Sequence, residues 1–213
     1  MFGENRKCLV LNNGVDTDKF RFSEVKRNEF RKELGISDDR EIIVHVGAFR
    51  PQKNHSFLID VFSCYQKAHK ESLLLLVGEG ELKNEIEEKV ESLGIGKNVL
   101  FLGQRLDLEK VLSGSDKFLF PSLYEGFPNA LLEAEASGLL CVVSDEITRQ
   151  TCLANSIALS LRSPVEVWSK ALGGEKCRNR ESYSKMVESK GYGIKGEIER
   201  LELLYRRISD GEM

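Results

Sequence analysis

The stretch EIIVHVGAFRPQKNHSFLIDVFSCYQKAHKESLLLLVG, residues 41–78, decides the fold of this chain. It begins with an apolar run at 41–49 that has the length of a buried strand and leads into a glycine-containing turn. Residues 54–70 then repeat apolar side chains at the spacing of one helical face, and 72–78 is a second short apolar run. A strand, a helix and a strand in this order predict two parallel strands joined by a helix.

The same alternation continues along the chain. Residues 81–94 repeat apolar side chains at helical spacing, and the pattern stops at Gly94. The other predicted elements are strands at 7–11, 98–103, 116–122 and 139–145 and helices at 23–34, 107–113 and 128–137. Near-continuous apolar strands separated by helices are typical of a parallel sheet covered on both faces. We therefore expect a doubly wound, Rossmann-like α/β fold.

The last third of the chain has a weaker pattern. Helix-start signals occur at 163–172 and 182–189, and residues 196–208 have the pattern of an amphipathic helix. The amphipathic pattern is carried by Ile198, Leu201, Leu204, Tyr205 and Ile208. A chain of 213 residues suits one well-filled domain, so we interpret 1–213 as a single unit. We expect the terminal helix to pack against this domain or a missing partner domain rather than against a membrane.

Composition excludes several classes of protein. The formal net charge of −3 provides no broad basic field, which argues against nucleic acid as a partner. No apolar run is long enough to span a membrane, and no signal segment precedes the first predicted strand. An odd number of cysteines without Cys-x-x-Cys spacing indicates reduced thiols in a cytoplasmic protein. These cysteines are Cys8, Cys64, Cys141, Cys152 and Cys177.

We predict no metal site. The Asp-Thr-Asp sequence at 16–18 invites a cation-binding interpretation, but it follows an Asn-Gly pair and is better explained as a turn. The histidines are scattered and do not form a ligand set. We expect His45 in the core, His55 at the start of a helix and His69 at the surface.

Three loops carry residues suited to a ligand. In open parallel sheets, ligands bind where the carboxyl ends of strands meet loops and helix starts. The loop at 47–55 combines a glycine, which lets the backbone approach a ligand closely, with Arg50 and with Lys53, a point charge suited to phosphate. The loop at 101–107 contains Arg105. The third loop leads into the helix predicted at 128–137.

This third loop places two carboxylates around a helix start. Pro128 suits the first helical position, so the free amides of residues 129–131 are expected to point outward and to attract a phosphate. Glu125 precedes the helix and Glu133 lies two turns later. Carboxylates accept hydrogen bonds from vicinal hydroxyls, as acidic side chains do with ribose in dinucleotide folds. A sugar–diphosphate–ribose ligand would use both carboxylates and the helix start between them.

Several segments resemble a known family. They are NNGVD (12–16), VGAFRPQKN (46–54), LLLVGEGEL (74–82), NVLFLGQR (98–105) and PSLYEGFPNALLEAEASG (121–138). Together they resemble the donor-binding half of retaining glycosyltransferases with the GT-B fold, of the family-4 type used in capsule, exopolysaccharide and lipopolysaccharide synthesis. The resemblance covers residues 8–208, and the Glu-x7-Glu element is its most specific part.

The resemblance implies a role for each residue of the site. Glu125 would contact the donor sugar, Glu133 would hold the ribose, and Lys53 would neutralise the diphosphate with the help of helix amides. Lys53 and Glu125 are therefore the predicted catalytic residues. The predicted donor-binding residues are Gly47, Arg50, Leu102, Arg105, Gly126, Phe127, Asn129, Ala130, Leu131 and Glu133. Leu102 and Arg105 would frame the base of a nucleotide-sugar, most often a UDP-sugar.

The family also implies a reaction without metal or cofactor, in which the sugar passes to a glycan or glycolipid acceptor. One departure is Ala48, where the family often has arginine; either Arg50 substitutes for it or the diphosphate is held more weakly. The amino-terminal acceptor domain is also missing, so the isolated domain should bind a donor without transferring the sugar efficiently. Peripheral membrane contact of a full-length protein stays open. The alternatives are a nucleotide-sugar epimerase and a non-catalytic α/β interaction domain.

Overall fold

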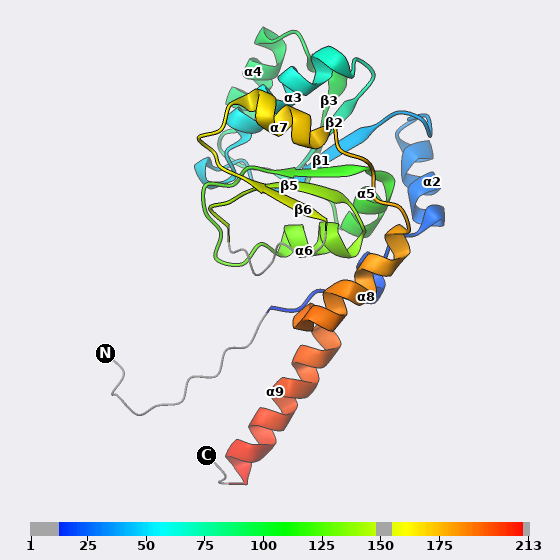
Figure 1. The fold of residues 1–213 in the computed structure, drawn as a ribbon, viewed down its shortest axis with the longest axis vertical. Helices are drawn as coiled ribbons and strands as arrows, with labels where there is room; N and C mark the ends of the chain where they lie inside the picture. The colour runs from blue at the N-terminus through cyan, green and yellow to red at the C-terminus, as the bar shows by residue number, and fades with distance from the viewer. Residues whose placement is uncertain (1–12, 148–154, 211–213) are drawn as a thin grey trace, which may run out of the picture.

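The computed structural model describes residues 13–147 and 155–210, and it contains one parallel sheet (Figure 1). Its strands are β1 (Ile42–Val46), β2 (Leu73–Val77), β3 (Val99–Gly103), β4 (Lys117–Phe120), β5 (Leu140–Ser144) and β6 (Ser156–Leu159). They lie in the order β3-β2-β1-β4-β5-β6, and every neighbouring pair is parallel. The predicted strand at 7–11 lies outside the described residues. Strand β6 was not predicted, because its side chains are only partly buried at the sheet edge.

Helices cover both faces of the sheet, which confirms the doubly wound fold. They are α1 (Thr17–Phe20), α2 (Glu24–Glu33), α3 (His55–Ala68), α4 (Lys83–Ser92), α5 (Leu108–Gly114), α6 (Asn129–Ala136), α7 (Val165–Leu172), α8 (Tyr183–Val187) and α9 (Ile194–Ser209). Helices α3, α4 and α7 pack on one face, and α1, α2, α5, α6 and α8 on the other. Figure 1 shows α3 and α7 on the opposite side of the sheet from α6.

The central strands explain why the sheet is buried on both sides. In β1, Ile42 and Val44 belong to the core that α2, α5 and α6 cover, whereas Ile43 belongs to the core under α3 and α7. Successive strand side chains point to opposite faces, so a strand between two helical layers must be apolar throughout. The continuous apolar runs that predicted the fold follow from this requirement.

Arg180 holds the carboxyl ends of α5 and α6 together. Its Nε donates to the carbonyl oxygen of Ser137 at 3.0 Å, just beyond the last residue of α6. Its Nη atoms donate to the carbonyl oxygens of Leu112 at 3.0 Å and Ser115 at 2.8 Å, at the end of α5. Carbonyl groups at helix ends have no partner within the helix and carry partial negative charge, which suits a guanidinium group. Burial nevertheless lowers the pKa of Arg180 to about 9.

We predict that Arg180→Ala lowers the free energy of unfolding by about 3 kcal/mol, because several buried carbonyl groups lose a charged donor. Urea unfolding followed by circular dichroism measures the change. Arg178→Ala is the matched control, since the Arg178 side chain is 91% exposed and pairs only loosely with Glu175. Equal stability of the two variants would contradict the assigned role of Arg180.

The amphipathic helix predicted at 196–208 is part of α9, but it does not pack on this domain. Figure 1 shows α9 extending away from the sheet, and none of its residues is buried. The start of α9 contacts other described residues: the amide of Val15 donates to the Tyr192 carbonyl at 2.8 Å, the amide of Ile194 donates back to the Val15 carbonyl at 2.9 Å, and Lys195 pairs with Asp18. The described part of its own domain therefore provides no surface that buries this helix.

Within the described parts of the chain, no helix has the length and apolar character needed to cross a bilayer.

Candidate functional site

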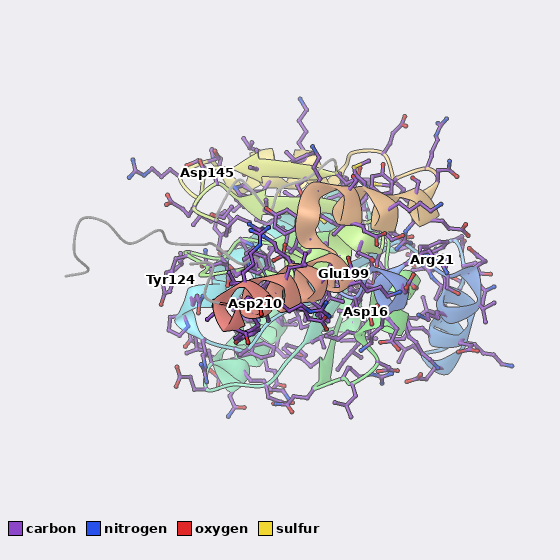
Figure 2. The ribbon with its side chains drawn as sticks, turned by 90° about the horizontal axis from the view of Figure 1, so that it is seen from below. Asp16, Arg21, Tyr124, Asp145, Glu199 and Asp210 are labelled. Carbon is purple, nitrogen blue, oxygen red and sulfur yellow. The ribbon has the colours of Figure 1, made fainter. Side chains whose placement is uncertain are left out.

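The candidate site lies where the strand order reverses. The chain fills the sheet outward from β1 to β3 and then returns to place β4 against the other edge of β1. The loops that follow β1 and β4 therefore meet at the carboxyl edge of the sheet, which is the place where open α/β folds bind ligands. Figure 2 shows that Tyr124 and Asp145, which follow β4 and β5, lie on one side of the domain, with Arg21 on the other.

The structure brings the two predicted catalytic residues into contact. Lys53 Nζ lies 2.7 Å from Oε1 of Glu125, and the Glu125 side chain is only 7% exposed. Lys53 ends a short 3₁₀ turn, η1 (Pro51–Lys53), and the next residue, Asn54, is left-handed with φ of 55°. That conformation turns the chain directly into α3. The lysine thus extends from the end of β1 across to the loop after β4.

Gly47 provides the space that Lys53 occupies. A Cβ at position 47 would lie 2.9 Å from His45 Nε2 and 3.1 Å from the Lys53 side chain. Gly78, with φ of +142°, follows β2, and a Cβ there would lie 2.2 Å from the Gly47 carbonyl oxygen. Position 78 needs glycine because the loops after β1 and β2 pack backbone against backbone there, whereas a side chain at position 47 would displace His45 or Lys53.

A cavity of about 300 Å³ opens beside these glycines. Its lining comes from the ends of β1 and β2, the loops after β1, β2 and β3, and the first residue of α5. The lining residues are Val46, Gly47, Ala48, Val77, Gly78, Glu79, Gln104, Arg105, Leu106 and Leu108. Leu102, predicted to frame a base, is half-buried and packs against the core instead of lining this cavity.

The two predicted arginines differ in their surroundings. Arg105 donates to both carboxylate oxygens of Asp107 at 2.9 Å and to Glu33 at 3.0 Å. Hydrogen bonds to these two acids raise the pKa of Arg105 above its usual value. Its charge is therefore already matched, and what it offers the cavity is mainly the shape of its side chain. Arg50 is exposed; its backbone takes part in the turn, whereas its side chain forms no hydrogen bond or ion pair among the described residues.

The start of α6 differs from the prediction. Pro128 is the N-cap, and Asn129 is the first helical residue. The amide of Asn129 donates to the Phe127 carbonyl at 3.0 Å, and that of Leu131 donates to the Pro128 carbonyl at 3.0 Å. The prediction of free amides at 129–131 was therefore wrong for two of the three positions. A tight turn at the helix start satisfies these amides locally, as often happens at helix ends.

Gly126, Phe127 and Ala130, the other predicted residues around this helix start, differ in their surroundings. Gly126 has open space around its α-carbon, with no atom within 4 Å of an added Cβ. Phe127 packs its ring against the core, 6.2 Å from that of Tyr192. Ala130 keeps an amide without a backbone acceptor among the described residues, so it is the amide of this helix start that is available to a ligand.

Glu133 lies in a second cavity of about 260 Å³. The cavity is lined by Asn13, Gly14, Val15, Asp16, Phe20, Asn129 and Glu133. Burial raises the pKa of Glu133 to about 7, and the charge of Lys19 offsets only part of this effect. Sequence reasoning did not place residues 13–16 in the site, although the NNGVD segment was part of the resemblance and was the signal that could have indicated it.

Two buried histidines lie beneath the Lys53 turn. The His45 ring hydrogen-bonds through Nδ1 to the Leu119 carbonyl at 2.9 Å, and its centroid is 4.7 Å from that of His55. Burial, and then the charge of Lys53, lower the pKa of His55 to about 4, and burial also lowers that of His45. Both rings are therefore neutral at pH 7. The predicted positions of His45 in the core, His55 at a helix start and His69 at the surface are confirmed.

The Asp-Thr-Asp sequence has structural contacts. Asp16 is the N-cap of α1 and accepts a hydrogen bond from the amide of Lys19 at 2.9 Å. Asp18 pairs with Lys195 of α9 at 2.6 Å. Among the described residues, no group of three or more His, Cys, Asp or Glu side chains is arranged to hold a metal ion.

We predict that Glu133→Gln stabilises the domain at about pH 8 by about 2 kcal/mol and has little effect at about pH 4. The buried carboxyl keeps its proton up to about pH 7, whereas an unfolded chain releases it near 4.5. Stability therefore falls as the pH rises between these values, and an amide removes that loss. Urea unfolding at both pH values measures it, with the exposed Glu88→Gln as control. A pH-independent difference between wild type and Glu133→Gln would contradict the burial of this acid.

Comparison with known proteins identifies the family. Residues 26–152, more than half of the chain, match the family described as Glycosyl transferases group 1. The chain belongs to this family. It is 36% identical over 171 residues to a protein of Bacillus subtilis (strain 168) called EpsF, covering 79% of this chain and 44% of EpsF. It is 33% identical over 159 residues to the UDP-Gal:alpha-D-GlcNAc-diphosphoundecaprenol alpha-1,3-galactosyltransferase of Escherichia coli, covering 73% of this chain and 41% of that enzyme.

This glycosyltransferase chain thus spans less than half the length of these two relatives. Its fold is that of the GT-B glycosyltransferases. The structure of Anabaena Alr3699/HepE in complex with UDP-glucose superposes with a TM-score of 0.78 at 19% identity, covering 93% of this chain and 57% of HepE. The doubly wound fold and the family predicted from the sequence are both confirmed.

Proposed function

We propose that this chain is the donor-binding domain of a retaining glycosyltransferase and that it binds a UDP-sugar. The observation that carries the proposal is the meeting of Lys53 and Glu125 at the reversal of the strand order, 2.7 Å apart. The name of the E. coli relative includes UDP-Gal, and the HepE structure contains UDP-glucose, which supports UDP as the nucleotide. Residues 1–213 would form one binding unit.

Each polar group of the site matches a part of such a donor. The diphosphate would lie between Lys53 and the Ala130 amide, where a cation and a helix start both favour negative charge. Glu125 would accept hydrogen bonds from hydroxyls of the donor sugar, with the backbone of residues 126 and 127 beside it. Glu133, on the ribose side of the diphosphate, would hold the ribose hydroxyls. Gly47, Arg105 and the cavity between them would receive the base.

The chemistry of transfer would use these positions directly. The bond between the sugar anomeric carbon and the β-phosphate oxygen breaks, and a new bond forms to an acceptor hydroxyl on the same face of the sugar. The proton of that hydroxyl passes to the departing diphosphate. Lys53 and the α6 helix start would stabilise the negative charge that develops on the diphosphate, a type of interaction commonly worth about 3 kcal/mol in a transition state.

The acceptor would be a glycan or glycolipid bound by an amino-terminal domain outside this chain. The E. coli relative is named for an acceptor on diphosphoundecaprenol, which supports a lipid-linked glycan and peripheral contact of the whole protein with a membrane. Helix α9 exposes apolar side chains of its amphipathic face, including Ile198 at 50% and Ile208 at 52% exposed. We assign this surface to the proposed amino-terminal domain, because an amphipathic helix gains stability by burying its apolar face.

We predict that the chain binds UDP and that Lys53→Ala weakens binding about 10- to 100-fold, because a charged donor to the diphosphate is lost. Isothermal titration calorimetry with UDP measures the change. Lys110→Ala is the control, since it removes the same charge from a lysine that pairs with Glu29 at 3.0 Å on the surface. Absence of UDP binding by the wild type would indicate an interaction domain, and conversion of a UDP-sugar without acceptor would indicate an epimerase.

We further predict that excess EDTA leaves the affinity for UDP unchanged. Lys53 and the helix start supply the positive potential that a divalent cation supplies in metal-dependent sites. Calorimetric titrations with EDTA and with added Mg²⁺ or Mn²⁺ test this expectation. A dissociation constant that improves several-fold with either cation would contradict metal-independent binding.

A further inference from the structure

The η1 turn holds the loop after β4 through several hydrogen bonds, and Gln52 makes most of them. The Leu123 amide donates to the Gln52 main-chain carbonyl at 2.8 Å. The Gln52 side-chain amide donates to the carbonyl oxygen of Tyr124 at 2.8 Å and to Oε2 of Glu125 at 3.3 Å. Gln52 is thus joined to three successive residues of a loop that lies more than 70 positions later in the sequence.

The carboxylate of Glu125 is consequently held from two sides. Lys53 contacts Oε1 at 2.7 Å, and Gln52 contacts Oε2 at 3.3 Å. Because the Glu125 side chain is only 7% exposed, water supplies little of its hydrogen bonding. A buried carboxylate needs a counter-charge or donors to keep its place.

A bound diphosphate would change this balance. Lys53 would turn its charge toward the phosphate oxygens, and Glu125 would lose its cation at the moment when it must face the donor sugar. The Gln52 amide carries no net charge, so the diphosphate does not draw it away. Among the described residues, the Gln52 amide is the side-chain donor that can stay on Glu125 both with and without bound diphosphate.

We propose that Gln52 is a positioning residue, which keeps the Glu125 carboxylate oriented toward the donor sugar while Lys53 serves the diphosphate. This inference rests on the proposed function, and it concerns a residue that the sequence motifs did not single out. It separates two contributions to donor affinity. The nucleotide part depends on Lys53, and the sugar part depends on Gln52 acting through Glu125.

The test compares ligands with and without a sugar. Calorimetry measures UDP, UDP-glucose, UDP-galactose, UDP-N-acetylglucosamine and UDP-N-acetylgalactosamine against wild type, Gln52→Ala and Gln52→Met. Methionine keeps the size of the side chain and removes its donor, so it separates the lost hydrogen bond from lost packing. We expect the best UDP-sugar to bind about tenfold more weakly to both variants, with UDP affinity unchanged within about twofold.

Gln66→Ala is the matched control. Gln66 also donates through its side-chain amide to a main-chain carbonyl, that of Lys70 at 3.3 Å, and to another side chain, but it does so on α3 away from the site. We expect this variant to bind every ligand as the wild type does. Thermal unfolding of each variant verifies that it is folded before titration.

A double-mutant cycle with Glu125→Ala distinguishes an effect of Gln52 on the Glu125 carboxylate from general stabilisation of the loop after β4. If Gln52 acts through Glu125, removing Gln52 from the Glu125→Ala protein has no further effect on UDP-sugar affinity. If Gln52 merely braces the loop through Tyr124, its removal weakens UDP and UDP-sugars equally in both backgrounds, which overturns the inference. Wild-type binding of UDP but equal affinity for all five ligands also overturns it. Failure of the wild type to bind UDP at all overturns the proposed function itself.

Discussion

The pairing of β1 with β4 is the constraint on which the site depends. Ile43 lies opposite Lys117 and Val44 opposite Phe118, although β2 and β3 separate these strands in the sequence. Because both strands run in the same direction, their carboxyl ends emerge together, and the loops that follow them share one edge of the sheet. The contacts of Lys53 and Gln52 with Glu125 exist only because of this arrangement.

Burial suppresses the charge of several titratable side chains near this edge of the sheet. The two histidines beneath Lys53 are kept neutral by burial, so they add no cation that would compete with the lysine. Glu133 is buried enough that its pKa rises to about 7. At neutral pH a carboxyl group in this state can donate as well as accept hydrogen bonds, which suits a hydroxyl-rich ligand. The expected cost to stability is common where polar groups are buried for binding.

The first described residues connect this site to α9. Val15 forms hydrogen bonds on both sides of Gly193, at the start of α9, and it also lines the cavity that contains Glu133. Gly14 permits the contact, because a Cβ there would lie 2.6 Å from the Ile194 backbone. The segment that fixes the exposed helix is therefore also a wall of the proposed ribose cavity.

Local pattern was enough to predict strands β1 to β5, most helices, the doubly wound class and the loops that meet at the site. Continuous apolar runs and helical periodicity depend on neighbours a few positions away, and Lys53, Glu125 and Glu133 were singled out as site residues from their positions relative to these elements. The edge strand β6 was missed because partial burial weakens the apolar signal. The amides of Asn129 and Leu131 were wrongly expected to be free, because the local sequence does not determine the exact turn at a helix start.

Other features were decided by tertiary structure alone. The sequence predicts that residues 196–208 form an amphipathic helix. It does not show that α9 extends away from this domain with its apolar face exposed. It shows a lysine and a glutamate, but not that they pair across 72 positions or that Gln52 holds the same carboxylate. Such contacts depend on which strands become neighbours, and that is settled by the packing of the whole sheet rather than by any one segment.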